Sequence, residues 1–256
     1  MKTKEFYKIL EEICPKELAE EWDNSGSQIS FDDDEIKNVL VALEVTYDVI
    51  KEAINKDVNL ILTHHPVYFD GNSWITPLYT PGAYALELVK HRISVYSAHT
   101  NFDNLVGGNN DYFAKVLGFD KISCPSGEGI YRLADIKPTT INDLIDDLCK
   151  AFGIKRSFVH LVGNPNQNVS RIGWCTGAGF DFIYDAYKEG AECYITGDVK
   201  YHDARDAHER GMNVIDIGHF GSEKIFAENM ISMLEKNNCE VNIIKSESDI
   251  DPFYEF

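Results

Sequence analysis

Three short apolar segments of this 256-residue chain each end at a histidine that precedes a turn. They read NLILTHHP at 59–66, SVYSAHTNFD at 94–103 and NVIDIGHFGSE at 213–223. In a sheet of parallel strands the carboxyl ends share one edge, and an apolar run that stops at a histidine delivers that side chain to the edge. The same pattern in three distant segments predicts an α/β fold with metal ligands at strand ends.

Strand-like and helix-like segments alternate along the rest of the chain. Helical spacing of apolar residues predicts helices at 47–55, 84–90 and 182–188, in the amphipathic segment 1–24, and after Thr140, a residue type that caps helices. Apolar, β-branched runs predict strands at 38–45, 58–63, 93–97, 169–175, 192–196, 213–217 and 241–244. Strands that alternate with helices are typical of mainly parallel sheets covered on both faces.

The stretch 124–138 combines Gly and Pro breaks with mixed polarity, and we expect it to divide the chain. The predicted fold is α/β, with two interlinked parts whose mainly parallel sheets are flanked by helices. Residues 1–123 would form the N-terminal part with the HHP and HTNFD motifs, and 124–256 the C-terminal part with the TGD and GHFGSE motifs. The metal site is expected in the cleft between them.

The charge of the chain narrows the range of partners. A formal net charge of -18 and a pI of about 4.7 argue against unaided binding to nucleic acid or to anionic membranes. No apolar run is long enough to cross a membrane, and the charged N-terminal segment does not read as a signal peptide. Six scattered cysteines without a CxxC pair fit a reducing compartment, so we expect a cytoplasmic location.

The adjacent pair His64 and His65 is the strongest candidate for metal binding. Neighbouring side chains of a regular strand point to opposite faces, so both imidazoles reach one ion only where the strand ends. Pro66 indicates that ending, because proline cannot donate to a sheet ladder. A lone histidine elsewhere is more often structural or exposed.

Two carboxylates accompany the other histidines. Asp103 follows the strand that ends near His99, although NFDN could equally be a local turn. His99 is either a ligand or an outer partner that orients one. Glu223 lies four residues after His219, so a helix that begins near 220–222 would bring both to one region. Its alternative role is a carboxylate at a helix N-terminus.

Three histidines and two carboxylates exceed the four ligands of a structural zinc site. Carboxylates can bridge two ions, and a pair of ions about 3.5–4 Å apart lowers the pKa of a bridging water. Mixed nitrogen and oxygen ligation admits zinc, iron, manganese, cobalt or nickel without distinguishing them. We therefore expect two divalent metal ions per subunit and hydrolytic chemistry.

Two further features bear on catalysis. His202, in GDVKYHDA, is a candidate for proton transfer beside the metal site, and its alternative is a histidine on a helix surface. The GAG segment from Gly177 to Gly179 could hold a phosphate at a helix N-terminus. A tight strand-to-helix turn explains the same glycines better.

Six motifs, in order along the chain, resemble the Nif-three-like family of dinuclear-metal hexameric proteins, often labelled GTP cyclohydrolase 1 type 2 homologues. They are WDNSGSQ at 22–28, ALEVT at 42–46, LTHHP at 62–66, AHTNFD at 98–103, ITGDVKYHDA at 195–204 and GHFGSE at 218–223. The resemblance covers nearly the whole chain and matches the short form without a central insertion. Glu44 stands where the family more often has Asp, and Asp198 stands where it more often has Glu. These exchanges suit residues that orient a metal ligand better than residues that bind the ion themselves.

The resemblance implies five metal ligands, with the two carboxylates as bridges: His64, His65, Asp103, His219 and Glu223. It places His99 in a supporting role and implies a toroidal homohexamer, a trimer of dimers, with sites that face an inner cavity. The implied activity is opening of the guanine ring of GTP by metal-activated water with release of formate. Our own candidates for catalytic residues in such a reaction are His202 and Glu223. Two alternatives stay open: a two-metal phosphoesterase, and a metal-binding or metal-delivery protein without turnover.

Overall fold

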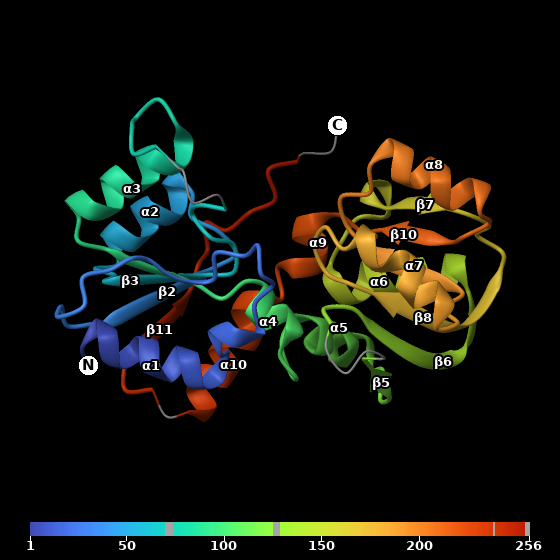
Figure 1. Cartoon of the computed structure of the whole chain (residues 1–256), viewed down its shortest axis with the longest axis horizontal. Helices are drawn as coiled ribbons and strands as arrows, with labels where there is room; N and C mark the ends of the chain where they lie inside the picture. Colours follow the sequence, from blue (N-terminus) through green and yellow to red (C-terminus); the bar gives the residue numbers. More distant parts are fainter. Residues whose placement is uncertain (70–73, 125–128, 238, 254–256) are drawn as a thin grey trace. The chain divides into compact units, whose positions relative to one another are not determined.

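A computed structural model describes residues 1–69, 74–124, 129–237 and 239–253 of the protein. This part of the chain forms two compact α/β units, each with its own sheet (Figure 1). Unit 1 comprises Met1–Leu105 and Phe226–Ile250, and unit 2 comprises Val106–Ile225 and Asp251–Phe256. The chain therefore enters unit 2 after Leu105 and returns to unit 1 at Phe226.

Unit 1 is built on a five-stranded sheet. The strands, in spatial order, are β1 (Gly26–Ile29), β4 (Ser94–Ser97), β3 (Leu60–Thr63), β2 (Asn38–Ala42) and β11 (Asn242–Lys245). Neighbours from β4 to β11 are parallel, and β1 pairs antiparallel with β4. Because β11 pairs with β2, the end of the chain completes a sheet that the first hundred residues begin.

Helices cover both faces of this sheet. Figure 1 shows α2 (Tyr47–Asn55) and α3 (Thr80–Lys90) on one face, and α1 (Thr3–Ile13) and α10 (Phe226–Lys236) on the other. Because both faces are covered, every residue of β3 is buried, and its sequence LILT is a continuous apolar run closed by a threonine. The short α4 (Thr100–Asn104) follows β4 and packs against η1, a 3-10 turn at 16–18.

Unit 2 contains a six-stranded sheet. The strands, in spatial order, are β5 (Ile122–Ser123), β6 (Arg132–Thr140), β8 (Asn168–Trp174), β9 (Cys193–Thr196), β10 (Val214–Asp216) and β7 (His160–Val162). Strands β8, β9 and β10 are parallel, and the other pairings are antiparallel. The mainly parallel arrangement expected from the sequence holds in unit 1, whereas this sheet is mixed. Strands β5, β6 and β7 are partly exposed and lack the continuous apolar runs of buried parallel strands.

Unit 2 contains several helices, and some of them place aromatic rings in its core. They are α5 (Asn109–Leu117), α6 (Ile141–Phe152), α7 (Ile183–Lys188), α8 (Tyr201–Glu209) and α9 (His219–Glu223), with 3-10 turns η2 (Arg156–Phe158) and η3 (Phe180–Phe182). The ring of Phe113 stacks on that of Phe152, with centroids 4.6 Å apart. Thr140 caps α6 as predicted, since its hydroxyl accepts a hydrogen bond of 3.1 Å from the backbone N of Asp143.

All seven predicted strands are present, as β2, β3, β4, β8, β9, β10 and β11. The division of the chain differs from the boundary expected at 124, because 106–123 belong to unit 2 and Phe226–Ile250 belong to unit 1. The stretch 124–138 lies within unit 2, and its residues 125–128 lie outside the described residues. Among the helices described here, none has both the length and the apolar character needed to cross a membrane.

The segment after β11 is tied to unit 1 by two carboxylates. Glu52 accepts hydrogen bonds from the hydroxyl of Ser246 at 2.7 Å and from the backbone N of Ser248 at 3.0 Å. Oδ2 of Asp249 accepts one from the backbone N of Leu43 at 2.6 Å. Burial raises the pKa of Asp249 to about 6, although the hydrogen bond from Leu43 opposes this shift.

Asp249→Asn is expected to stabilise the protein above pH 6. The folded-state pKa of Asp249 lies above its ordinary value of 3.8, so folding disfavours ionisation. This cost is absent well below pH 3.8, grows as the pH rises towards 6 and is constant above that. Asparagine keeps an oxygen acceptor for Leu43 and has no charge. Urea denaturation should give the variant a free energy of unfolding about 1–2 kcal/mol higher at pH 7.5, after allowance for partial exposure, and nearly equal at pH 4.

Candidate metal centre

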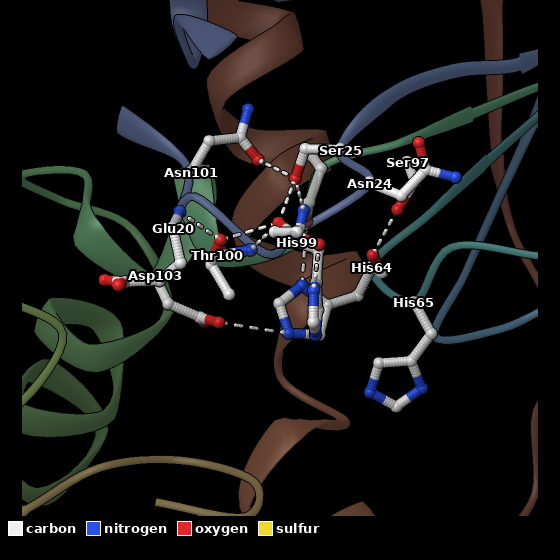
Figure 2. Close-up of polar contacts among 12 residues, drawn as sticks. Glu20, Asn24, Ser25, His64, His65, Ser97, His99, Thr100, Asn101 and Asp103 are labelled. Atoms are coloured by element: carbon white, nitrogen blue, oxygen red, sulfur yellow. Dashed lines mark hydrogen bonds and ion pairs between the residues drawn. The ribbon is translucent and has the colours of Figure 1, made fainter. Parts of the chain in front are cut away.

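Three imidazoles of unit 1 meet at one edge of its sheet (Figure 2). His64 and His65 follow β3 and His99 follows β4, and because these neighbouring strands are parallel, their carboxyl ends lie together. The ring centroids are 5.2 Å apart for His64 and His65, 5.1 Å for His64 and His99, and 5.7 Å for His65 and His99. One ring nitrogen from each lies within 4.8 Å of the other two. The structure thus brings together three of the histidines singled out in the sequence.

The hydrogen bonding of His64 leaves one ring nitrogen suited to a metal ion. Its Nδ1 lies 2.8 Å from the carbonyl oxygen of Ala98, and because a carbonyl only accepts, Nδ1 carries a proton and donates it. In the neutral ring Nε2 then holds the lone pair that a metal ion requires. This Nε2 lies 3.5 Å from Oδ2 of Asp103, and both side chains are buried (Figure 2).

A buried carboxylate orients His99. Oδ1 of Asp23 lies 2.8 Å from Nδ1 of His99, while Oδ2 accepts hydrogen bonds of 2.6 Å from the hydroxyls of Ser25 and Thr100. Burial alone would raise the pKa of Asp23, but the hydrogen bonds from His99, Ser25 and Thr100 and the charge of His99 hold it well below its usual range. Asp23 was not among the residues singled out in the sequence, and only its place in the WDN motif could have drawn attention to it.

Exposed aromatic rings border these imidazoles. The ring centroids of Trp22 and Phe69 lie 5.9 Å and 5.7 Å from that of His99, and both rings stand nearly perpendicular to it. Trp22 is 64% exposed and Phe69 is 51% exposed. The edge of the sheet that carries the imidazoles therefore has an apolar rim with free aromatic surface.

His219 and Glu223 form a second cluster, in unit 2. Both lie in α9, which follows β10 and is preceded directly by Gly218, where φ is 79°. Nε2 of His219 lies 2.8 Å from Oε2 of Glu223, and its Nδ1 lies 2.7 Å from Oδ2 of Asp198. Burial alone would lower the pKa of His219, but the two carboxylates outweigh it and raise the pKa to about 10. This environment favours a cation at the ring, either a proton or a metal ion.

Gly177 lies against the second cluster in a left-handed conformation, with φ of 66°. A Cβ at this position would lie 2.0 Å from Oε1 of Glu223 and 3.3 Å from Nε2 of His219. Its backbone N donates to the hydroxyl of Ser222 at 2.9 Å, and the backbone N of Gly179 donates to Thr196 at 3.0 Å. Because both N–H groups have partners within unit 2, the GAG segment is better explained as a tight turn than as a phosphate cradle.

His202 lies in the first turn of α8 and is exposed. Its ring contacts that of Tyr201, with centroids 5.4 Å apart. The geometry of unit 2 thus gives His202 a solvent-facing position on a helix, and its role in proton transfer stays a prediction. Tyr201 is 75% exposed, so this end of α8 presents two rings to solvent.

Asp198→Asn is expected to weaken metal binding about 10- to 100-fold. In other metal sites this is the effect of losing a carboxylate that holds a metal-binding histidine in place. Asp198 adopts φ of 54°, and asparagine tolerates this left-handed conformation as well as aspartate does. The variant therefore removes the charge behind His219 with little change to the backbone. Calorimetric titration with Zn²⁺ measures the effect. The control is Asp185→Asn, which alters an exposed ion pair with Lys188 in the same unit. Equal Zn²⁺ affinities for both variants would contradict a role of Asp198 in holding His219 for the ion.

Comparison with known proteins shows which protein family this chain is similar to. The family model described as Duf34/NIF3 (NGG1p interacting factor 3) matches residues 1–252. A GTP cyclohydrolase 1 type 2 homolog of Clostridium perfringens is 37% identical over 261 aligned residues, which cover 99% of each chain. Another of that name from Lactococcus lactis subsp. lactis is 35% identical and covers 100% of each. Among solved structures, the Staphylococcus aureus hypothetical protein SA1388 superposes with a TM-score of 0.91 at 29% identity, over 100% of this chain and 99% of that one.

Proposed function

Because this chain belongs to the DUF34/NIF3 family, we propose that it is a dinuclear metal-dependent hydrolase of the GTP cyclohydrolase 1 type 2 kind. The name of its relatives suggests the reaction, which is opening of the guanine ring of GTP with release of formate. The proposed ligands of the two ions are the five residues that the resemblance implies: His64, His65, Asp103, His219 and Glu223.

One observation carries the proposal. In each unit a histidine has its Nδ1 held by an acceptor, the carbonyl of Ala98 for His64 and Asp198 for His219. In each case Nε2 faces a buried carboxylate, at 3.5 Å for His64 and Asp103 and at 2.8 Å for His219 and Glu223. Histidines that bind metal have this arrangement, since a partner on one nitrogen fixes the ring and leaves the other nitrogen for the ion.

The donor set fits divalent transition-metal ions. Imidazole nitrogen and carboxylate oxygen suit zinc, iron, manganese, cobalt and nickel. The five proposed ligands comprise three in unit 1 and two in unit 2, and neither number reaches the four of a closed site. The resemblance implies two ions that would share ligands, with Asp103 and Glu223 as the carboxylates that could be shared. When bound, such ions would lower the pKa of a water molecule and offset negative charge on the substrate.

Other residues of the chain support a planar, aromatic substrate. Trp22 and Phe69 offer flat apolar surface beside the imidazoles of unit 1, and an aromatic heterocycle can stack on such rings. His202 would move the proton that the leaving group requires, because an imidazole can both accept and donate a proton. Its exposure on α8 leaves its ring accessible to a substrate.

We also propose that the protein is a cytoplasmic homohexamer, as the resemblance implies. End-to-end similarity to relatives of the same length supports a common assembly. Light scattering after gel filtration should give the mass of six 29.0 kDa subunits. A monomer under the same conditions would contradict the hexamer and leave the metal chemistry as proposed.

Formate release tests the function directly. The purified protein, loaded in turn with Zn²⁺, Mn²⁺, Fe²⁺, Co²⁺ and Ni²⁺, is incubated with GTP, and formate and phosphate are assayed separately. Formate that depends on metal and falls in both the His202→Ala and the Glu223→Ala variants is the expected result. Phosphate without formate would favour a phosphoesterase. Two bound ions without turnover of GTP would favour a metal-binding or metal-delivery protein.

A further inference from the structure

Two aromatic side chains of unit 1, Trp22 and Phe69, remain exposed beside the imidazoles. Their rings stand at 78° and 80° to that of His99, with centroids 5.9 Å and 5.7 Å away. Phe69 also lies near His65, with centroids 6.4 Å apart. Large apolar side chains left in water at one place are typical of a binding site.

The loop that carries Trp22 is held on both sides of this residue (Figure 2). The hydroxyl of Thr100 accepts a hydrogen bond of 2.9 Å from the backbone N of Glu20 and donates one of 2.6 Å to Asp23. The carboxylate of Asp23 also accepts a hydrogen bond of 2.6 Å from the hydroxyl of Ser25. Because the backbone is fixed in advance, the exposed ring loses little conformational freedom when a ligand binds.

Asn24 joins this loop to the segment that carries Phe69. Its Nδ2 donates to the carbonyl of Tyr68 at 2.8 Å, and Nε2 of Gln28 donates to the carbonyl of Asn24 at 2.6 Å. Phe69 follows Tyr68 directly, and Trp22 lies two residues before the asparagine. One side chain thus connects both ring-bearing segments across 44 positions of sequence, so hydrogen bonds within unit 1 fix the two segments relative to each other.

The polar side chains that follow Trp22 use their donors within the protein. Nδ2 of Asn24 donates to two acceptors, at 2.8 and 3.3 Å, and Nε2 of Gln28 donates to two, at 2.6 and 3.3 Å. The hydroxyl of Ser25 donates at 2.6 Å. An amide has two hydrogens to donate and a hydroxyl has one, so within the described segment 20–29 these three side chains keep no donor for the edge of a heterocycle. Stacking, which tolerates different rings, is what this loop offers a ligand.

Charge determines which end of a nucleotide these rings suit. The two residues before Trp22 are Glu20 and Glu21, and the segment 17–28 contains no Lys or Arg. Carboxylates beside an exposed ring repel a triphosphate and leave a neutral ring unaffected. The heterocycle of a nucleotide therefore fits this place better than its phosphates do.

We propose that Trp22 and Phe69 form a stacking subsite for a flat, two-ring aromatic heterocycle, a purine or a pteridine. The subsite selects its ligand by flatness and not by the groups at the ring edge, and Asn24 is the positioning residue of the two rings. This inference rests on the proposed function only in taking a nucleotide as the ligand. It deepens that function, since guanine and adenine nucleotides should bind alike, and a preference for GTP would arise in the reaction that follows.

Tryptophan fluorescence of the metal-loaded protein tests the selectivity. GTP, ATP, UTP and inorganic triphosphate are mixed in turn with the Trp74→Phe variant, whose remaining tryptophans are Trp22 and the buried Trp174. GTP and ATP should quench the emission within milliseconds, with dissociation constants within about 10-fold of each other. UTP should bind more weakly, because its single ring overlaps less, and triphosphate should not quench. A larger preference for GTP over ATP would overturn selection by flatness.

Trp22→Ala separates stacking from contacts to the phosphates. By calorimetry this variant should bind GTP and ATP about 5- to 150-fold more weakly and respond to inorganic triphosphate as the wild type does. Asn24→Ala should weaken both nucleotides by a smaller factor, because the rings remain but are no longer held. Trp74→Ala, which removes another exposed ring of unit 1, should change nothing. Nucleotide affinities of Trp22→Ala within twofold of the wild type would overturn the subsite.

The subsite and the proposed function fail separately. Binding of both purine nucleotides that depends on Trp22, without release of formate, would contradict the cyclohydrolase and support the subsite. Release of formate with the same KM for GTP in the wild type and in Trp22→Ala would support the hydrolase and overturn the subsite. If Trp22→Ala changes the mass in light scattering and leaves nucleotide binding intact, the ring belongs to an interface between copies, which would also overturn the subsite.

Discussion

Glu223→Ala is expected to lower kcat/KM for GTP by about 1,000-fold and to remove one of two bound metal ions. Glu223 is buried at the end of α9, and its Oε2 lies 2.8 Å from Nε2 of His219. The variant would remove a bridging carboxylate and, with it, the partner that holds His219 at the ion. A loss of about 4 kcal/mol in transition-state stabilisation corresponds to the expected fall in rate.

Two variants control this result. Glu209→Ala removes an exposed glutamate of α8, paired with Arg205 at 3.1 Å, and should leave both ions and full turnover. Glu223→Gln preserves the size of the side chain but loses the charge, so it should retain the fold and still lose the ion. Elemental analysis and formate assays on the same samples give both readouts. Two retained ions with unchanged turnover in Glu223→Ala would mean that this carboxylate has no place in the metal centre.

The strand-end histidines could be predicted because the information is local. An apolar run that stops at a histidine identifies both a strand and the side chain at its end, and β3, β4 and β10 have this form. His64, His99 and His219 follow these strands directly or within a few residues. The same local reasoning predicted the cap of α6 at Thr140, because a cap depends on residues three apart in sequence.

The carboxylate that orients His99 and the division of the chain into two units could not be predicted in this way, because both depend on contacts between positions far apart in the sequence. Asp23 reaches His99 across 76 residues of sequence, and no local pattern in WDN encodes a carboxylate that must be buried. In the same way β11 pairs with β2 and returns 226–250 to unit 1. Composition marks where a chain can turn, but strand pairing decides which unit a segment joins.

Gly177→Ala is expected to remove the metal ion that depends on Glu223 as completely as Glu223→Ala does. The added Cβ would lie 2.0 Å from Oε1 of Glu223 and 2.9 Å from its Cδ, so the carboxylate would have to shift. Glu223 is buried and its Oε2 lies 2.8 Å from Nε2 of His219, so a shift of the carboxylate would disturb that contact. A single methyl group, on a residue that binds no ion, should therefore abolish turnover.

Gly211→Ala separates this clash from the cost of the backbone conformation. Gly211 has φ of 68°, close to the 66° of Gly177, but a Cβ there would meet nothing within 4 Å. Both variants incur the left-handed strain of a non-glycine residue, about 1–2 kcal/mol, so both should melt at a lower temperature than the wild type. Only Gly177→Ala should lose an ion and release no formate. If both variants keep two ions and equal turnover, Glu223 moves aside without loss, and its contact with His219 is then not a requirement of the metal centre.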